Sequence, residues 1–340
     1  MLNMKYFIFI LFLTGFVWSC NKEADSRIDY QFTKPDHFPP TTYNLAGNPI
    51  SEKGFKLGKK LFNDPILSND YSIACSNCHV KSVAFTDPQH RLSLGVNERQ
   101  GTRNTPSIAN MAFMKEFVWD GGIIHLDFVP PNAIENPNEM DLKLDHLITR
   151  LNKHHEYPAL FRNVFKGIDS ITTPYVLKAL SQYQLLLVSS NSKYDHYVQG
   201  LEKLTLEESN GKKLFDEKCS VCHSGPLFTN QSYQNNGLDL IFSDEGRARI
   251  TETSKDMGKF KVPSLRNVSL TAPYMHDGRF ADLGQVLDHY SEGVKRSSTL
   301  SPILINNDRM GIPLTKEEKG AIITFLKTLT DYEFINDERF

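Results

Sequence analysis

Two copies of the pattern Cys-x-x-Cys-His constrain this 340-residue chain more than any other feature of its sequence. They lie at residues 75–79 (CSNCH) and 219–223 (CSVCH) and use four of the five cysteines. The side chains concerned are Cys75, Cys78, His79, Cys219, Cys222 and His223. Two thiols at this spacing add to the two vinyl groups of one porphyrin, and the adjacent histidine then meets the iron from one face. The pattern therefore predicts two covalently bound haem c groups.

Three other uses of these cysteines are weaker. A zinc site could combine two CxxC pairs, but the pairs are far apart in the sequence and neither has the flanking residues of a zinc ribbon. A thioredoxin-like redox pair needs one CxxC inside a βαβ unit, and it does not explain His79 and His223. Disulfides between neighbouring thiols would suit an exported protein but would have no role there. We therefore favour haem attachment.

The sequence also repeats itself around the two motifs. The string GKKLF occurs at residues 58–62 and again at 211–215, each time ahead of a CxxCH motif. Downstream, PSIAN at 106–110 is matched by PSLRN at 263–267, and an Asp-Gly pair follows each proline at the same distance. A shared order and spacing of this kind predicts two duplicated domains.

The fold class that we expect is mainly α, with two cytochrome c-like haem domains and long loops, because strand-like alternation is scarce. Helices are expected over residues 51–63, 143–166, 174–193, 205–215 and 283–290. Thr315 and Glu318 form a capping box for a final helix that ends at Leu329. The predicted domains are an N-terminal haem domain at 46–200 and a C-terminal haem domain at 201–340.

The first residues are typical of an export signal. Lys5 precedes an apolar run that is too short to span a bilayer, and Ser19-Cys20 resembles a bacterial lipoprotein cleavage site. We therefore expect residues 1–19 to be a signal peptide, Cys20 to carry the lipid that anchors the protein to a membrane, and residues 20–45 to be a tether. The expected location is the periplasm, since bacteria attach haem c outside the cytoplasm. The alternatives are an uncleaved anchor and ordinary secretion with a free thiol.

The charge balance bears on the partners of the protein. The chain has 38 Lys and Arg against 40 Asp and Glu, a net charge of −2. Nucleic-acid binding proteins carry a basic stripe instead. We therefore expect no nucleic-acid partner.

Over residues 45–335 the chain resembles the bacterial di-haem cytochrome c peroxidases and their MauG-type relatives. The strings that carry the resemblance are NTPS at 104–107, FVWDG at 117–121, ENPNEM at 135–140 and TAPYMHDG at 271–278. In that family the N-terminal haem meets peroxide and the C-terminal haem relays electrons to it. The resemblance implies an exported cytochrome-c peroxidase that reduces hydrogen peroxide with electrons from a small cytochrome or similar donor. Members are often dimers, so a homodimer is also compatible with it.

The same strings imply roles for individual residues. His79 matches the proximal ligand of the peroxidatic haem, and His223 matches that of the relay haem. Trp119 resembles the tryptophan between the two haems, although an ordinary core aromatic is an equal reading of it. Glu139 resembles the distal acid and base that moves a proton between the peroxide oxygens during cleavage. Glu135 competes with it for this role.

The resemblance further implies a calcium site between the domains. Asn104, with the backbone carbonyls of Thr271 and Pro273, matches the family's ligand set, and oxygen donors suit this hard cation. Ordinary turns could also place these residues where they are.

The second axial ligand of the relay haem separates the branches of the family. Many peroxidases use a methionine, which raises the reduction potential of the iron. The matching position here is Tyr290, as in the MauG branch, and a phenolate stabilises ferric and higher iron states. Met275 is the competing ligand.

Two departures from the family concern the peroxide side. Val129 and Ala133 replace a glutamine and a proline, so the distal pocket is expected to be less polar or differently shaped. The loop at 95–103 has no histidine to serve as a removable sixth ligand, and His90 is out of register. We expect a haem that is open to peroxide without reductive activation.

Two rival functions follow from the same residues. A MauG-like enzyme would oxidise side chains of a partner protein, and Tyr290 and the missing loop histidine favour it. A non-catalytic di-haem electron carrier is the third possibility, and it predicts that both irons are six-coordinate and low-spin.

Overall fold

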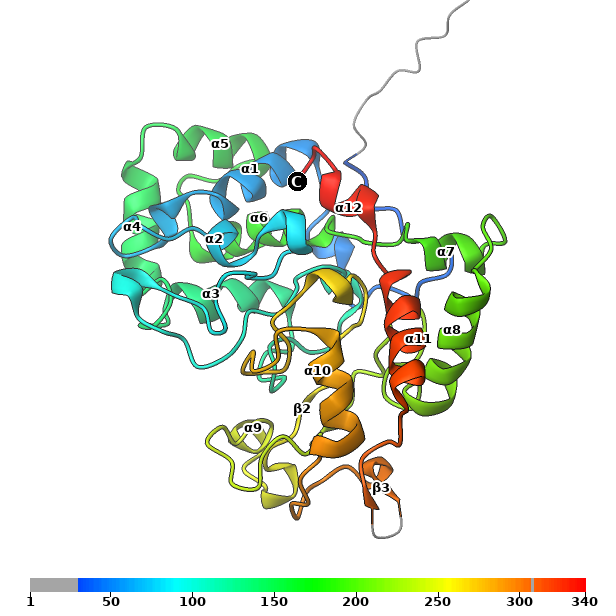
Figure 1. The fold of residues 1–340 in the computed structure, drawn as a ribbon. Helices are drawn as coiled ribbons and strands as arrows, with labels where there is room; N and C mark the ends of the chain where they lie inside the picture. The colour runs from blue at the N-terminus through cyan, green and yellow to red at the C-terminus, as the bar shows by residue number, and fades with distance from the viewer. Residues whose placement is uncertain (1–29, 307–308) are drawn as a thin grey trace, which may run out of the picture.

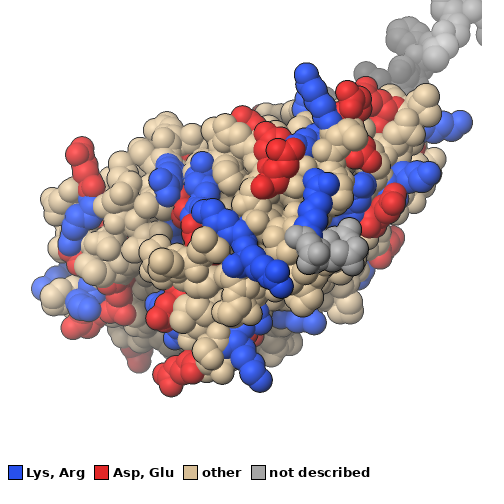
Figure 2. Space-filling view, turned by 60° about the horizontal axis from the view of Figure 1, so that its bottom comes forward, with Lys and Arg blue, Asp and Glu red and all other residues tan. Residues whose placement is uncertain are grey.

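The computed structural model describes residues 30–306 and 309–340. The expected signal peptide at 1–19 and the lipid site at Cys20 lie outside the described residues. Among those described, no helix is both long and apolar enough to cross a bilayer. Basic and acidic side chains are interspersed over the face in Figure 2, so the balance of charge in the composition also holds locally there.

The described part of the chain is mainly helical, as expected (Figure 1). The α-helices are α1 Glu52–Phe62, α2 Cys75–Cys78, α3 Val129–Ile134, α4 Leu144–Lys153, α5 Tyr157–Val164, α6 Thr173–Leu185, α7 Lys193–Val198, α8 Leu206–Lys218, α9 Ala248–Thr251, α10 Leu283–Asp288, α11 Lys316–Lys327 and α12 Tyr332–Asn336. The short strands β1 Tyr233–Gln234 and β2 Phe260–Lys261 pair antiparallel, with Tyr233 opposite Lys261. The strands β3 Ile305–Asn306 and β4 Arg309–Met310 also pair antiparallel.

Two helix pairs organise two hydrophobic cores. Helix α1 packs on α6 in the first core, and α8 packs on α11 in the second (Figure 1). In both pairs the glycine of the GKKLF string lies at the contact. An added Cβ would lie 2.1 Å from the Ala179 carbonyl oxygen at Gly58, and 2.0 Å from the Ala321 carbonyl oxygen at Gly211. The repeated glycine therefore lets the two backbones approach closely.

The second repeated string also adopts the same local structure twice. Ser107 Oγ donates to the Ala84 carbonyl at 2.6 Å, and Ser264 Oγ donates to the Leu227 carbonyl at 2.6 Å. The last residue of each string has a left-handed backbone, which asparagine tolerates better than most residues. The side chain of this asparagine hydrogen-bonds the segment that follows α6 in the first repeat and α11 in the second. Asn110 bonds the Ser189 backbone, and Asn267 accepts from the Asp331 amide. The duplication seen in the sequence is thus a duplication of structure.

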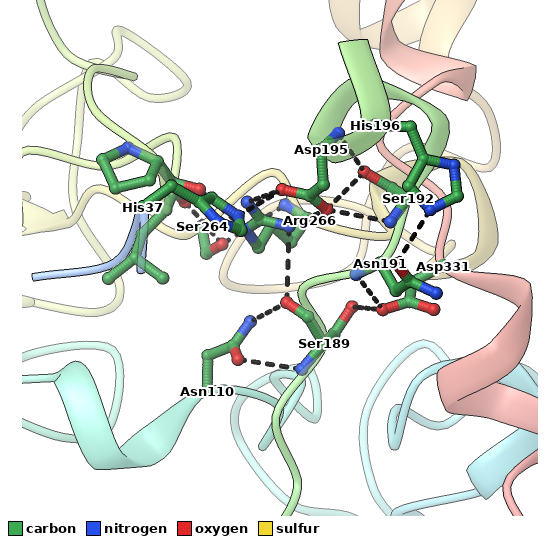
Figure 3. A network of polar contacts seen from close by, with 12 residues as sticks. His37, Asn110, Ser189, Asn191, Ser192, Asp195, His196, Ser264, Arg266 and Asp331 are labelled. Carbon is green, nitrogen blue, oxygen red and sulfur yellow. Dashed lines mark hydrogen bonds and ion pairs between the residues drawn. The ribbon is translucent and has the colours of Figure 1, made fainter. Parts of the chain in front are cut away.

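A buried polar network joins the two repeats (Figure 3). Arg266 donates to both carboxylate oxygens of Asp195, at 2.7 and 2.9 Å, and Asp195 also contacts His37 Nε2 at 2.8 Å. The Ser189 carbonyl accepts from Asn110 of the first repeat at 3.1 Å and from Arg266 of the second at 3.3 Å. Burial alone would raise the pKa of Asp195, but the hydrogen bonds and charge of Arg266 outweigh burial and lower that pKa to about 2.

Both ends of the described chain differ from the expected domain limits. Residues 30–45, expected to belong to a tether, pack on the first core, where Phe38 and Tyr43 are buried. These aromatic side chains lie between prolines and polar residues, so composition alone conceals them. At the other end, Phe334 and Phe340 also pack on the first core, against Phe85. The C-terminal segment therefore crosses back from the second half to the first.

Two expected helices have different lengths in the structure. The single helix expected over 143–166 is wrong, because the chain forms α4 and α5 with a break between them. Pro158 lies in the first turn of α5, where its missing amide hydrogen costs nothing. Inside one long helix it would remove a backbone hydrogen bond and break the helix. Helix α6 ends at Leu185, earlier than the expected 193. The capping boxes at Thr205 and Thr315 are both confirmed.

We expect Gly58→Ala and Gly211→Ala each to lower the free energy of unfolding by about 1–3 kcal/mol, because an added methyl overpacks the helix contact. Gly320→Ala in α11 is the matched control, since nothing lies within 4 Å of its added Cβ. That substitution should stabilise the helix by about 0.5–1 kcal/mol. Chemical denaturation of the haem-loaded protein measures the free energy of unfolding of all three variants. Equal changes in the three would contradict the role of close backbone approach at Gly58 and Gly211.

Asp195→Asn should destabilise the protein by about 3–5 kcal/mol near neutral pH, because it leaves the Arg266 guanidinium buried without a counter-charge. The pKa of Asp195 is lowered from 3.8 to about 2 on folding. The stabilisation from its charge is therefore fully present above about pH 4 and is lost as the pH falls towards 2.

Urea denaturation across this pH range tests both statements. Asp216→Asn is the control, because Asp216 is an exposed carboxylate paired with Lys212, and such pairs contribute about 0–1 kcal/mol. An Asp195→Asn protein as stable as the wild type would refute the prediction.

Candidate functional site

A single cavity of about 1270 Å³ runs between the two repeats and contains both CxxCH motifs. Typical small-molecule pockets measure about 300–1,000 Å³, so this space suits more than one ordinary ligand. Phe62 and Phe215, the last residues of the two GKKLF strings, both line it. The packing of each repeated helix therefore shapes the wall next to its own motif.

The two motif histidines are held in the same way. His79 Nδ1 lies 2.9 Å from the Phe85 carbonyl oxygen, and His223 Nδ1 lies 3.0 Å from that of Phe228. A carbonyl can only accept, so each Nδ1 carries the hydrogen and each Nε2 keeps a free lone pair for a metal. Burial also lowers the pKa of both imidazoles and so favours the neutral form that ligation requires.

The four motif cysteines are free thiols that line the cavity. Burial raises the pKa of Cys75 and Cys219 to about 12, so neither is a ready thiolate in this state. Among the described residues, no group of three or more His, Cys, Asp or Glu side chains could hold a metal ion, which argues against the zinc alternative. Neither CxxC lies in a βαβ unit of the described fold. Paired thiols, free imidazole nitrogens and a large shared cavity together fit two covalently attached porphyrins.

Trp119 lies in the cavity wall where the two repeats meet. Its Nε1 donates to the Asn104 carbonyl at 2.8 Å, and its own carbonyl accepts from the Lys261 amide at 2.8 Å. The Asn104 amide in turn donates to the His276 carbonyl at 2.7 Å. Trp119 thus connects backbone segments of both halves.

Glu139 and Glu135, which sequence reasoning could not separate, have different surroundings. Glu139 lines the cavity and accepts from Asn136 Nδ2 at 2.9 Å, and burial raises its pKa. Glu135 is not among the cavity-lining residues, and its carboxylate accepts from the Leu144 amide at 3.3 Å, at the start of α4. The tertiary structure therefore presents Glu139, and not Glu135, to the cavity.

The departures on the peroxide side also have a structural outcome. Val129 and Ala133 line the cavity as expected, but Asn132 and Asn136 line it beside them. Amide groups that sequence reasoning missed, from Asn132 on α3 and Asn136 after it, thus keep this wall polar. His90 is absent from the lining, and its Nδ1 lies 2.9 Å from the Asp87 carboxylate.

Lys261 is a further residue that sequence reasoning missed. It lines the cavity next to Trp119, and its Nζ donates to the Glu116 carbonyl at 2.7 Å. Burial lowers its pKa to about 8. A cation in this wall suits the carboxylate groups of a porphyrin. No sequence signal marks it, because its contact with Glu116 joins segments that are far apart in the chain.

The remaining candidates also lie along the cavity. Tyr290 and Met275, the two candidate ligands on the second side, both line it, and so do Asn104, Thr271 and Pro273 of the expected calcium site. Tyr290 follows α10 in a π-helical turn, His289–Gly293, and burial raises its pKa to about 12. Turns of this kind are frequent at functional sites.

Comparisons with known proteins agree with this arrangement. Residues 52–203 match the sequence profile of the family described as di-haem cytochrome c peroxidase. The chain is 33% identical to the methylamine utilization protein MauG of Methylorubrum extorquens, over 88% of this chain and 83% of that one. It is 34% identical to the cytochrome c551 peroxidase of Nitrosomonas europaea, over 81% of this chain and 79% of that one.

Solved structures are similar as well. A MauG-like protein associated with microbial copper homeostasis superposes with a TM-score of 0.84 at 33% identity, covering 92% of this chain and 99% of that one. The diheme peroxidase BthA of Burkholderia thailandensis superposes with a TM-score of 0.73 at 21% identity, covering 85% and 88%, and at this identity it supports the fold alone.

Proposed function

The chain belongs to the di-haem cytochrome c peroxidase family, and from this membership we propose that it reduces hydrogen peroxide to water. Each peroxide takes up two protons and two electrons, and the electrons come one at a time from a small cytochrome or a similar redox protein. The observation that carries the proposal is the shared cavity, which combines both CxxCH motifs with a buried carboxylate on one side. When bound, the haem irons supply the redox chemistry.

The first haem is held by Cys75, Cys78 and His79, and the second by Cys219, Cys222 and His223. The matching contacts of the two imidazoles with the Phe85 and Phe228 carbonyls support this assignment. The two haem domains correspond to residues 46–200 and 201–340, apart from the C-terminal segment that packs back on the first core.

Glu139 is the proton carrier on the peroxide side. Burial raises the pKa of this carboxyl above its ordinary value, so it holds a proton more readily than an exposed glutamate and can pass it between the two oxygens of a bound peroxide. Asn136 fixes the carboxyl by a hydrogen bond, and the amide of Asn132 lies in the same wall. These polar groups favour the binding of a small polar substrate in an otherwise apolar space.

Trp119 would connect the two haems for electron exchange, and Tyr290 would be a ligand of the second iron. Supporting observations are the contacts of Trp119 with both halves and the position of Tyr290 in the wall of the cavity that the second motif also lines. We further propose a calcium ion held by the Asn104 side chain and the Thr271 and Pro273 carbonyls. Its support is the resemblance and the position of all three along one cavity.

Export to the periplasm and a lipid on Cys20 are also part of this proposal. They rest on the sequence of residues 1–20 and on the covalent attachment of haem c, which takes place outside the cytoplasm in bacteria.

A MauG-like activity on side chains of a partner protein is the second candidate function. It is favoured by Tyr290 in the cavity wall and by the absence of a histidine from the 95–103 loop. A pure electron carrier is disfavoured by the buried acid of Glu139, which electron transfer alone does not need.

The resting ferric protein should show one high-spin and one low-spin iron in EPR, and it should oxidise a reduced small c-type cytochrome only when peroxide is added. Two low-spin signals without turnover, from protein with both haems attached, would reject the peroxidase and favour a carrier. Slow cytochrome oxidation together with peroxide-dependent modification of a partner protein would favour the second candidate.

Glu139→Gln should lower peroxide turnover by about 100- to 10,000-fold, because it removes the proton carrier and keeps the shape of the side chain. Glu135→Gln is the matched control. It lies outside the cavity lining and keeps an acceptor oxygen for the Leu144 amide, so turnover should stay at the wild-type rate. Haem content and ferric spectra should be unchanged in both variants, and a Glu139→Gln enzyme with normal turnover would rule out this role.

A further inference from the structure

We propose that Asn236 is a positioning residue that selects Tyr290 over Met275 as the second ligand of the iron on the His223 side. The inference rests on the proposed function, because it assumes a haem at the second motif. All four side chains line the same cavity. None of the motifs in the sequence pointed to Asn236.

Asn236 contacts both competing ligands at once. Its Nδ2 donates to Met275 Sδ at 3.3 Å, and its side chain lies near the Tyr290 hydroxyl, where it opposes the rise in the pKa of that phenol that burial causes. An asparagine amide carries two N–H donors, so it can donate to a thioether sulfur and to a phenol oxygen at the same time. The Asn236 carbonyl also accepts from His289 Nε2 at 3.0 Å, which fixes the residue directly before Tyr290.

The backbone on both sides of Asn236 is clamped to a distant segment. The side chain of Asn235 donates to Ser297 and Thr299 at 2.9 Å each, and its carbonyl accepts from the Ser301 amide at 3.0 Å. Gly237, with a φ of +75°, donates to Asn235 Oδ1 at 2.8 Å. The amide of Asn236 is therefore held in place by its neighbours before any ligand binds.

Tyr290 is also held from its backbone. Its carbonyl accepts from the Ile312 amide at 2.7 Å, and Gly311 approaches so closely that an added Cβ would lie 2.5 Å from that carbonyl oxygen. These contacts at its main chain hold Tyr290 in the cavity wall.

Met275 occupies a position that the fold creates for another reason. The repeat aligns Met275 with Val118, since both directly precede the equivalent residues Trp119 and His276, and both have a positive φ, 77° and 60°. Valine cannot bind a metal, so this backbone conformation belongs to the repeated turn and is no adaptation to ligation.

The chemistry of the two contacts sets the direction of the selection. An N–H donated to an anionic oxygen is roughly twice as strong as one between neutral groups, whereas a thioether sulfur is a weak acceptor. The amide of Asn236 therefore favours a coordinated phenolate at Tyr290 and occupies the sulfur of Met275 at the same time. Without this amide the preference for Tyr290 weakens and the sulfur becomes available.

Resonance Raman, optical and EPR spectra of the ferric, haem-loaded protein test the inference. The wild type should show a tyrosinate signature on one haem, and Asn236→Leu should lose most of it and gain the charge-transfer absorption of a sulfur ligand. The reduction potential of that haem should rise accordingly, because methionine raises it. In Asn236→Leu/Met275→Leu the sulfur band should disappear, and Met275→Leu alone should leave the wild-type spectrum unchanged.

Gln234→Leu is the matched control, since it removes an amide from the same wall that contacts Ser232 and Ser301 instead. Its tyrosinate signature should persist. Asn236→Thr is the milder variant in case Asn236→Leu loses haem, and its single hydroxyl donor should leave a mixture of the two ligand sets.

A full tyrosinate signature in Asn236→Leu, or in Asn236→Thr if the former does not bind haem, would overturn the inference. A wild-type protein without tyrosinate on either haem would overturn it as well, together with the assignment of Tyr290. Peroxide turnover is measured separately. The spectra would therefore still test the role of Asn236 if the protein proved to have no peroxidase activity.

Discussion

The hydrogen bond from each motif imidazole to a phenylalanine carbonyl is the interaction on which both halves depend. Phe85 and Phe228 have positive φ values of 63° and 52°, a conformation that bulky residues keep only when surrounding packing holds it. Their rings are buried in the two cores, and the carbonyl just before each accepts from the serine of the repeated P-S-x-x-N string. Core packing and the second repeated string therefore together set the direction of the free imidazole nitrogen, and they do so in both halves of the chain.

The walls facing the two histidines differ although the scaffold is the same. On the first side, α3 and the turn after it bring a buried acid and two amides to the cavity. On the second side, a π-helical turn and a clamped loop bring Tyr290, Met275 and Asn236 together. One scaffold can thus hold two porphyrins in similar ways and still give their irons different tasks, because the difference lies in side chains outside the duplicated strings.

Local signals predicted much of the fold correctly. The capping boxes at Thr205 and Thr315 marked the starts of α8 and α11, because a cap involves only the first turn of a helix. One error was local, because Pro158 splits the expected long helix. Another occurred where a distant contact decides, since the aromatic side chains of residues 30–45 pack on a core formed mostly by later residues. The roles implied for Trp119, Tyr290 and the calcium ligands remain predictions, although the structure places all of these residues along one cavity.

By itself, the sequence determined the attachment chemistry, the duplication and the mainly helical class, because each depends on spacing within a short stretch of chain. Only the tertiary structure decided that Glu139 faces the cavity while Glu135 caps a helix, and that His90 turns to Asp87. The same holds for Asn236, which reaches Met275 and Tyr290 from a separate loop. These outcomes arise from contacts between segments that are far apart in the chain, and neither the spacing nor the type of a residue specifies which distant segment will pack against it.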